Sequence, residues 1–215
     1  MIDIYFFKMK KYKTIVYVDG FNLYYGVLKN TPYKWLNIDL MVKNLLTQNE
    51  IIGIKYFTAP VTGKNRLKNQ KNYIETLKTT IPYFECIQGH FKVKQVEMRN
   101  LNPPPENVRG TVSEEKGTDV NIAVEIVKDS CLRDFDCVVL VSNDSDLERA
   151  LIIAKENGKK IVLITPLFKN SKSKAARLLV VNADHHYPRI HPHTLKDSLL
   201  PKSVGKYNCP VHWNN

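Results

Sequence analysis

The sequence predicts an α/β protein built around a largely parallel sheet. Short runs of β-branched and other apolar residues alternate along the chain with segments of helical periodicity. The short runs are apolar on both faces, as strands of a parallel sheet are when helices cover them. Alternation of such strands with helices is typical of this fold class. At 215 residues the chain suits one large domain, which buries roughly 70% of its unfolded surface.

Four segments have the pattern of buried strands. The first covers residues 14–18 (TIVYV) and stops at Asp19. The others are 54–58 (IKYFT), 137–141 (CVVLV) and 161–165 (IVLIT).

Helical segments are expected between these strands. Residues 40–46 and 69–78 are two candidates. The spacing i, i+3, i+4, i+7 predicts two more helices together with their buried faces, namely Val120, Ala123, Val124 and Val127 in one and Leu147, Ala150, Leu151 and Ala154 in the other. Gly158 provides a C-terminal stop for the last of these helices.

Other segments interrupt the alternation. Residues 85–99 (ECIQGHFKVKQVEMR) predict a pair of extended strands around Gly89, and the three prolines of 102–105 predict a stiff loop. Prolines recur after His185 and exclude a long helix there. We therefore expect a basic N-terminal extension, a single domain, and a tail rich in Pro and His that packs on the same domain, over residues 1–13, 14–184 and 185–215.

The net charge of +11 is unevenly distributed. Residues 100–154 contain 5 Lys and Arg against 11 Asp and Glu, whereas the segments before and after them are basic. The hydrophobic (43%) and charged (25%) fractions exclude collagen-like, disordered and disulfide-scaffold proteins. A basic surface suggests a polyanionic partner, either nucleic acid or an anionic membrane. The same charge is equally compatible with a surface that is only solvated and binds no such partner.

The sequence predicts a cytoplasmic protein that does not enter the membrane. No apolar run approaches the ~18 residues of a membrane span. Residues 1–13 are too short and too rich in lysine for a signal peptide, and Met9 is a second plausible start. The four cysteines show no zinc spacing, so reduced thiols are expected at Cys86, Cys131, Cys137 and Cys209.

Four aspartates lie where parallel sheets bind ligands, beyond the carboxyl ends of strands. Asp19 ends the first strand in VDGFN, Asp144 and Asp146 follow the strand 137–141 in SNDSD, and Asp119 begins a helix. Taken singly, each is also a common cap or turn residue. Four carboxylates at one edge would repel one another without a cation, and hard oxygen ligands select Mg²⁺ or Mn²⁺. The sequence therefore predicts a metal site.

Carboxylate-bound Mg²⁺ in a basic surrounding suits phosphodiester hydrolysis, because the metal activates water and neutralises the phosphate. Basic residues that could follow a nucleic-acid backbone are Lys64, Arg66, Lys68, Lys71, Lys92, Lys94 and Arg99. Aromatic residues are interleaved with them, at Tyr56, Phe57, Tyr73, Phe84 and Phe91. Core packing is the favoured role of each ring, and an exposed ring could stack on a base.

Three segments, in this order, resemble the NYN domain: VDGFNLYYG at 18–26, KGTDVNIAV at 116–124 and VSNDSDLERAL at 141–151. More narrowly, they resemble its LabA-like, DUF88-type branch within the PIN-like nuclease superfamily. The similarity extends through YFTAPV at 56–61, GHF at 89–91 and CPVHW at 209–213. It implies a PIN-like three-layer α/β/α fold, a mostly parallel sheet of order 3-2-1-4-5, and metal-dependent ribonuclease activity. From the acidic cluster we expect single-stranded RNA to be the substrate.

The resemblance also implies roles for single residues. Asp19, Asp119 and Asp144 match the metal-binding positions, and Asp146 is a fourth ligand or a close neighbour. Asn22 matches the amide that orients a phosphate or a metal-bound water. Weaker candidates for substrate contact are Lys116 and Ser142. The family usually has glycine where this chain has Asn143, and if that position requires a positive φ, Asn is the next most tolerant residue.

One alternative stays open: an RNA-binding or regulatory module that keeps the fold and the metal but cleaves poorly or not at all. A homo-oligomer or a regulatory protein partner is compatible with either function. The histidines of the tail fit no zinc spacing and favour a polar surface. An aspartyl phosphatase would need an acidic residue at Phe21, and a Toprim-type site would need a glutamate at Asp19.

Overall fold

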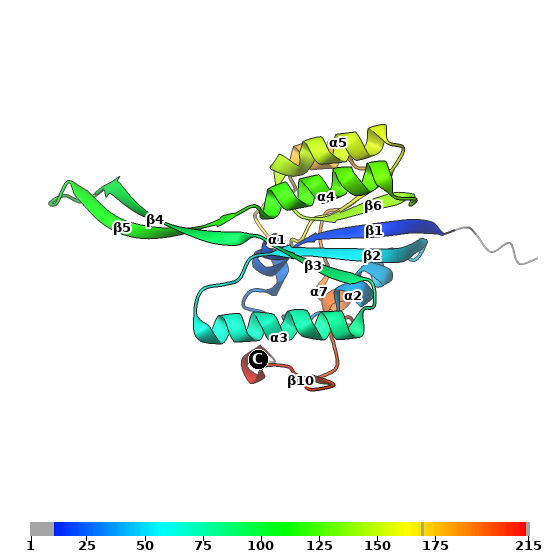
Figure 1. The fold of residues 1–215 in the computed structure, drawn as a ribbon, viewed down its shortest axis with the longest axis horizontal. Helices are drawn as coiled ribbons and strands as arrows, with labels where there is room; N and C mark the ends of the chain where they lie inside the picture. Colours follow the sequence, from blue (N-terminus) through cyan, green and yellow to red (C-terminus); the bar gives the residue numbers. More distant parts are fainter. Residues whose placement is uncertain (1–10, 169, 214–215) are drawn as a thin grey trace, which may run out of the picture.

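In the computed structural model, which describes residues 11–168 and 170–213, six strands form one sheet whose neighbours are all parallel (Figure 1). Their order is β3-β2-β1-β6-β7-β8. Numbered along the chain, the first five sheet strands have the predicted order 3-2-1-4-5, and the sixth is added beside β7. The strands are β1 Tyr12–Asp19, β2 Asn49–Thr58, β3 Phe84–Gln88, β6 Cys137–Val141, β7 Lys160–Ile164 and β8 His185–Tyr187.

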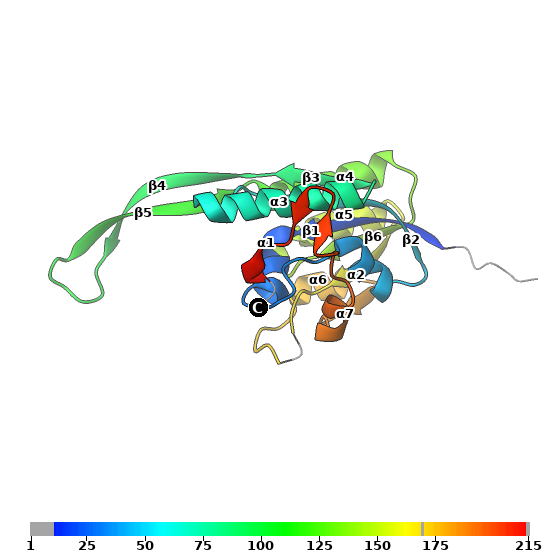
Figure 2. The same cartoon turned by 90° about the horizontal axis from the view of Figure 1, so that it is seen from below.

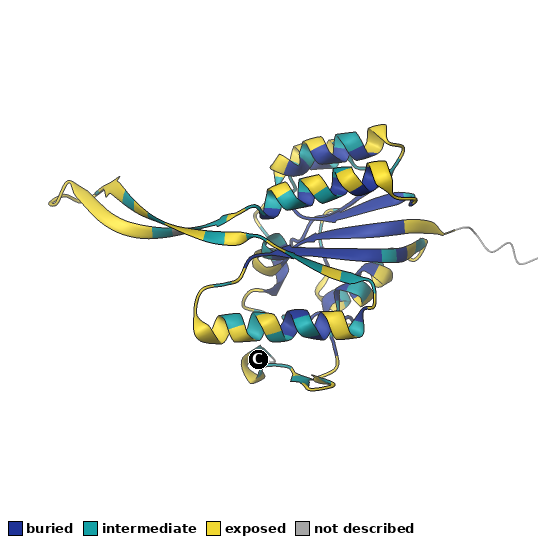
Figure 3. Ribbon diagram, viewed as in Figure 1, coloured by how far each residue is buried: buried dark blue, intermediate teal, exposed yellow. Residues whose placement is uncertain are grey.

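Helices cover both faces of this sheet, which confirms the three-layer α/β/α architecture. One layer contains α2 Ile38–Leu45, α3 Lys64–Thr80 and α7 Pro192–Lys196. The other contains α4 Thr118–Leu132, α5 Glu148–Glu156 and α6 Arg177–Asn182. Successive β1 side chains pack alternately into the two layers, with Val16 and Val18 on one side and Ile15 and Tyr17 on the other. The central strands of the sheet are buried between them, whereas the edge strand β3 is only partly buried (Figure 3).

The predicted buried face of α4 is correct in part: Ala123 and Val127 pack against the core, but Val120 and Val124 do not. Val120 and Val124 are 65% and 54% exposed, whereas Ile122 and Ile126 are fully buried. The buried face also includes Asp129, a charged residue that a search for apolar positions does not detect. The helix is therefore rotated from the expected orientation, because a buried carboxylate with its own partners occupies part of the inner face.

Asp129 belongs to a buried polar group that joins α4 to β1 and β2. Lys55 Nζ lies 2.6 Å from Asp129 Oδ2 and 2.5 Å from Glu125 Oε2. The Tyr17 hydroxyl donates to Asp129 Oδ2 at 2.8 Å. Each partner is needed, because a buried charge left without its counter-charge costs several kcal/mol.

The two extended strands predicted around Gly89 are present, one on each side of it, but they do not pair with each other. β3 joins the edge of the parallel sheet, and the chain passes through Gly89 into β4 (His90–Arg99), which pairs antiparallel with β5 (Asn107–Lys116). Gly89 has no positive φ and donates its N–H to the Thr58 carbonyl, so the chain does not reverse there. The reversal occurs instead at the loop that contains residues 102–105. β4 and β5 form an arm that projects from the body (Figures 1 and 2).

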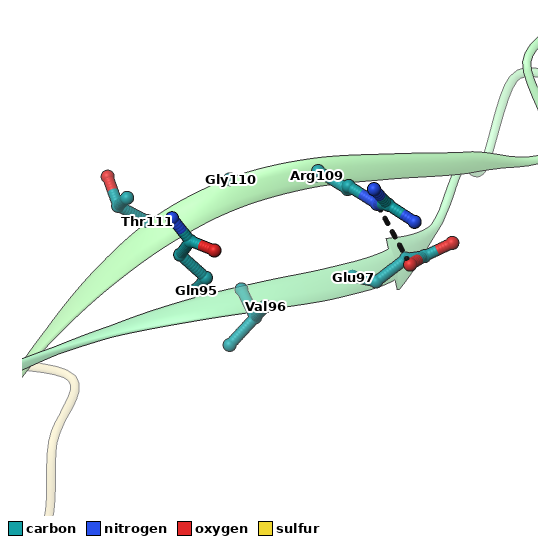
Figure 4. A pocket seen from close by; sticks show the side chains of 6 residues that line it. All are labelled: Gln95, Val96, Glu97, Arg109, Gly110 and Thr111. Atoms are coloured by element: carbon teal, nitrogen blue, oxygen red, sulfur yellow. Dashed lines mark hydrogen bonds and ion pairs between the residues drawn. The ribbon is translucent and has the colours of Figure 1, made fainter.

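The outer part of the arm is a bare two-stranded ribbon. A hollow of about 600 Å³ lies against it, and its lining residues are Gln95, Val96, Glu97, Arg109, Gly110 and Thr111. Figure 4 shows Arg109 and Glu97 joined across the strands, at 3.1 Å. This hollow is larger than the pocket described below, but its one carboxylate is already paired, so it offers no cluster of reactive groups.

Residues 185–213 lie against the body in short elements. β8 joins the sheet, and Leu195 of α7 packs in the core. The Trp213 ring lies 6.0 Å from the rings of both Trp35 and Tyr73. The remaining elements here are β9 Ser203–Val204, β10 Tyr207–Asn208 and the single turn Val211–Trp213.

Further expectations concern the N-terminal extension, the cysteines and the absence of a membrane-spanning helix. Most of the basic extension 1–13, including Met9, lies outside the described residues. Cys86, Cys131 and Cys137 are free thiols, as expected. In the described part of the chain, no helix combines the length and the apolar character that crossing a membrane requires.

Candidate functional site

A pocket of about 360 Å³ opens beyond the carboxyl ends of β1 and β6, beside the start of α4 and the root of the arm. This is the edge at which open parallel sheets bind ligands. Three of the four predicted aspartates line it. The lining residues are Asp19, Phe21, Asn22, Tyr25, Phe91, Glu115, Thr118, Asp119 and Asp144.

Asp19 is held rigidly at the end of β1. Its side chain caps the short helix α1 (Gly20–Leu23), accepting the Asn22 backbone N–H at 2.9 Å. Its other oxygen accepts the Asn22 side-chain amide at 2.6 Å and the Ser142 hydroxyl at 3.0 Å. The residue is 2% exposed. Burial raises the pKa of Asp19 above its ordinary value, although the hydrogen bonds from Asn22 and Ser142 act against the rise.

Asn22 and Asn143 connect this carboxylate to a neighbouring segment. The Asn143 backbone N–H donates to Asn22 Oδ1 at 3.2 Å. The Asn143 side chain donates to the Lys174 carbonyl at 3.1 Å and accepts the Ala176 N–H at 2.7 Å. Among non-glycine residues that the structure describes, the positive φ is at Asn30 and not at Asn143. Asn143 therefore serves as an anchor for residues 174–176, and its place in the turn does not depend on tolerance of a positive φ.

Asp144 and Asp146 differ in position although they are two residues apart. Asp144 is half-buried, lines the pocket, and caps the turn Ser145–Leu147 by accepting the Asp146 N–H at 3.0 Å. Its own N–H donates to the Ser142 hydroxyl at 3.1 Å. Asp146 is exposed and is not among the lining residues. Asp144 therefore lines the same pocket as Asp19, whereas Asp146 lies outside it.

Asp119 lies in the first turn of α4 and faces the same pocket. Gly117, with φ 88°, turns the chain from β5 into this helix. Burial and then repulsion by Asp144 and Asp19, with smaller effects of Glu115 and Asp146, raise the pKa of Asp119 to about 6. The carboxylates are therefore close enough to interact electrostatically.

Glu115 is a fourth acidic group in the pocket that the sequence argument missed. It comes from the end of β5 and accepts hydrogen bonds from both the N–H and the hydroxyl of Thr118. The capping signal known from sequences is a Ser or Thr followed three residues later by Glu or Gln, and here the glutamate comes first. No local pattern therefore marks Glu115, and its place in the pocket depends on how the arm joins the body.

One wall of the pocket is aromatic. The rings of Phe21 and Tyr25 are stacked with centroids 6.5 Å apart, and Phe91 meets Phe21 edge-on at 6.0 Å. Tyr25 belongs to the π-helical turn Tyr24–Leu28, and Phe91 to the root of β4. Lys29 Nζ lies 4.9 Å from the Tyr25 ring centroid. Of the aromatic residues interleaved with basic ones, Phe91 reaches the site, whereas Tyr56, Phe57 and Tyr73 are buried.

The predicted basic contacts lie outside the pocket. Lys116 pairs with Glu114 at 3.0 Å. Lys64, Arg66 and Lys68 are on the first turns of α3, which follows the carboxyl end of β2. Further basic side chains, Lys172, Lys174 and Arg177, are exposed around the segment that Asn143 anchors. None of these basic side chains is among the lining residues of the pocket.

The donor set suits a hard divalent cation, since Asp19, Asp119 and Asp144 supply carboxylate oxygens and repel one another. Within residues 11–168 and 170–213, however, no three His, Cys, Asp or Glu side chains are grouped so that they could hold an ion together. Mg²⁺ usually binds through one or two carboxylates and keeps several waters. The residues therefore fit a largely hydrated ion rather than a cage of three protein ligands.

Comparisons with known proteins agree with this architecture. A protein from Pseudomonas putida named 6-hydroxy-3-succinoylpyridine 3-monooxygenase is 31% identical over 198 residues. The match covers 78% of this chain and 64% of that protein, so the chain spans less than two thirds of its length. The crystal structure of a protein of unknown function from Vibrio parahaemolyticus is 19% identical, with a TM-score of 0.56 over 89% of this chain and 98% of that one. An identity this low supports the fold alone.

A match at the level of the family covers most of the chain. The NYN domain matches residues 13–190, a range that contains all four aspartates and the whole parallel sheet except Tyr12, the first residue of β1. This range also contains β8, the strand that lies within the predicted tail. The chain therefore belongs to the NYN domain family.

Proposed function

We propose that this protein is a ribonuclease of the LabA-like, PIN-like type, which hydrolyses RNA phosphodiester bonds with a bound Mg²⁺ or Mn²⁺ ion. The observation that carries the proposal is the convergence of Asp19, Asp119 and Asp144 on one pocket at the carboxyl edge of the sheet. Their mutual repulsion favours binding of a cation there. An isolated cap or turn aspartate would not have two carboxylate neighbours.

The charge arrangement supports a polyanionic substrate. The pocket is acidic, whereas exposed Lys64, Arg66 and Lys68 on α3 and the basic segment around Lys174 lie outside it. Lysine and arginine bind phosphate backbones with release of counterions. The basic groups would hold the strand while the acidic pocket holds the ion.

In this proposal Asp119 and Asp144 would hold the ion, with Asp19 behind them. When bound, a divalent ion would activate water and neutralise the phosphate. Three hydrogen bonds from Asn22 and Ser142 keep the Asp19 carboxylate in one orientation. The Asp146 N–H orients Asp144 in the same way. Such preorganised groups need little rearrangement when the substrate binds.

The decisive experiment is an RNA cleavage assay with purified protein in Mg²⁺ or Mn²⁺, with and without a chelator. Asp144→Asn should reduce cleavage by at least about 100-fold, the usual loss when a group that stabilises the transition state is removed. The asparagine oxygen can still accept the Asp146 N–H, so the fold should persist. Asp134→Asn is the matched control, because Asp134 is on the surface and pairs with Lys13.

Two results would contradict the proposal. If wild type and Asp144→Asn leave single-stranded RNA equally intact with either metal, the protein is not a nuclease on that substrate. RNA binding without cleavage would then favour the alternative, an RNA-binding or regulatory module. If Asp134→Asn loses as much activity as Asp144→Asn, the loss comes from a general charge effect.

A second candidate function is binding of a small heteroaromatic acid. The related protein named as a monooxygenase acts, by its name, on a hydroxylated pyridine. The aromatic wall beside the carboxylates is an observation that favours a flat ring in the pocket. The test is a thermal shift with 6-hydroxy-3-succinoylpyridine. A shift that Tyr25→Ala removes would support this candidate, and no shift at millimolar ligand would eliminate it.

A further inference from the structure

The aromatic wall of the pocket lies outside the hydrophobic core. Tyr25 is 62% exposed, although its phenol ring stacks on Phe21. Phe21 and Phe91 are half-buried and are not members of either core cluster. Exposure of an ordered aromatic cluster is unfavourable in water, so rings that remain uncovered at a pocket are candidates for ligand contact.

The wall is assembled from two distant parts of the chain. Phe21 lies in α1, which Asp19 caps, and Tyr25 lies in the π-helical turn that continues from α1. The carboxylate that lines the pocket therefore also fixes the start of the segment that carries both rings. Phe91 comes from the root of β4, where it is opposite Glu115 of β5 in the antiparallel register. The arm thus contributes one ring and one carboxylate to the site.

From this geometry we propose that Phe21, Tyr25 and Phe91 form a stacking platform for one unpaired nucleobase of the RNA. Every base has a π-face, so such a platform accepts any base. The phosphate attached to the stacked nucleotide would lie toward the carboxylates on the other side of the pocket. Lys29, 4.9 Å from the Tyr25 centroid, brings a positive charge to the same wall.

The platform requires a single-stranded substrate. The pocket of about 360 Å³ is near the lower end of the range for small-ligand sites, roughly 300–1,000 Å³, and accommodates one nucleotide rather than a duplex. In an RNA duplex the bases are stacked on one another and their faces are hidden. This inference rests on RNA as the proposed substrate but not on its cleavage.

The test is a binding experiment without metal, so that cleavage does not interfere. Fluorescence anisotropy in EDTA would measure the affinity of a labelled single-stranded oligoribonucleotide for wild type, Tyr25→Ala, Tyr25→Phe and Phe91→Ala. Loss of one stacking ring should weaken binding roughly 5- to 150-fold, and Tyr25→Phe should bind like wild type. Tyr25 is the primary variant, because its exposed ring can be removed without loss of core packing.

Tyr207→Ala is the matched control. Tyr207, in β10 on the far side of α3, also has a lysine over its ring, with Lys206 Nζ 5.4 Å from the centroid. Its removal should leave RNA affinity unchanged.

An oligonucleotide with one abasic position adds a second readout, with the abasic position moved stepwise along the strand. When it reaches the position that stacks on the platform, the affinity of wild type should fall. The affinity of Tyr25→Ala should not fall further, because its stacking contact is already lost.

Three results would overturn the platform: Tyr25→Ala binding as tightly as wild type, Tyr207→Ala losing as much affinity as Tyr25→Ala, or no binding of single-stranded RNA by wild type. If only the nuclease proposal fails, the pattern of results differs from these three. In that case the affinity still depends on Tyr25, but no cleavage occurs when Mg²⁺ or Mn²⁺ is restored.

Discussion

At the scale of single residues, the glycine after Asp19 is required by close packing rather than by an unusual backbone angle. A Cβ at Gly20 would lie 2.6 Å from the Tyr56 ring and 2.7 Å from the Phe57 carbonyl oxygen. Gly20 has no positive φ. The motif VDGFN therefore brings the start of α1 against β2, which fixes Asp19 and Asn22 above the sheet.

Gly20→Ala should lower the free energy of unfolding by about 1–3 kcal/mol, the usual cost of overpacking. Gly53→Ala is the control, because a Cβ there would meet Ile15 at an ordinary 3.6 Å. The control should be neutral or stabilising by up to about 1 kcal/mol, since alanine restricts the unfolded chain. Urea denaturation of both variants measures the difference, and equal stabilities would contradict the packing argument.

Asn143 also acts at this scale, through two hydrogen bonds to the segment 174–176. Asn143→Ala should lower the free energy of unfolding by about 1–2 kcal/mol and speed amide hydrogen exchange at Ala176. Asn157→Ala, which removes a side-chain amide bonded within its own helix, should leave exchange at Ala176 unchanged. Unchanged exchange in Asn143→Ala would show that the segment is held by other contacts.

At the scale of elements, α4 joins the acidic pocket to the interior of the molecule. Its first turn carries Asp119, and its buried face carries Asp129, paired with Lys55 of β2. The apolar stripe predicted from the sequence overlaps the buried face only at Ala123 and Val127. The fully buried positions include Asp129, whose pairing partner is in a distant strand. Periodicity of apolar residues predicts that a helix exists, but a buried ion pair can change the face that it buries.

This buried group makes stability depend on pH. Burial by itself raises the pKa of Glu125, but ion pairs with Lys128 and Lys55 outweigh it and lower the pKa below the usual 4.5. A carboxylate with a depressed folded-state pKa stabilises the fold above its unfolded pKa, and this contribution is lost as pH falls through the folded value. Wild type should therefore exceed Glu125→Gln in stability at pH 7, and the gap should narrow below about pH 4.5.

Urea denaturation across pH 3.5 to 7 measures that gap. Glu75→Gln is the control, because Glu75 forms an exposed pair with Lys78 on α3. An exposed pair of this kind contributes at most about 1 kcal/mol, so this variant should differ little from wild type at any pH. A gap for Glu125→Gln that stays constant with pH would mean that the stabilisation is not electrostatic.

The arm formed by β4 and β5 is the element that the sequence predicted least well. Residues 85–99 are extended, as predicted, but they divide at Gly89 between two different sheets. A tight reversal at Gly89 would need a turn, whereas β4 continues outward and finds its partner beyond the proline loop. Strand propensity is local, and the choice of partner depends on where the rest of the chain places each edge.

At the scale of the whole molecule, acidic residues from four separate segments meet at one edge of the sheet. Asp19, Asp119, Asp144 and Glu115 reach the pocket from β1, α4, the end of β6 and β5. Their repulsion opposes folding when no cation is present. The molecule should therefore be more stable with a divalent ion than without one.

Mg²⁺ or Mn²⁺ at about 100 times its Kd should raise stability by about 2.7 kcal/mol, which corresponds to about 5–10 °C in Tm for a domain of this size. Asp144→Asn removes one repelling charge, so in EDTA its Tm should equal or exceed that of wild type. In saturating metal the order should reverse. Differential scanning fluorimetry tests this crossover, and an equal shift in both proteins would place the ion elsewhere.

Local patterns were enough to predict the parallel α/β architecture and the three aspartates that line the pocket, because periodicity marks the elements and parallel strands end at one edge. The order of the first five sheet strands was predicted from the resemblance to the NYN domain. The folded structure was needed to show that Phe91 and Glu115 join the pocket, that Asp146 stays outside it, and that Asn143 anchors a distant segment. Those outcomes depend on contacts between segments far apart in the chain, which local patterns do not encode.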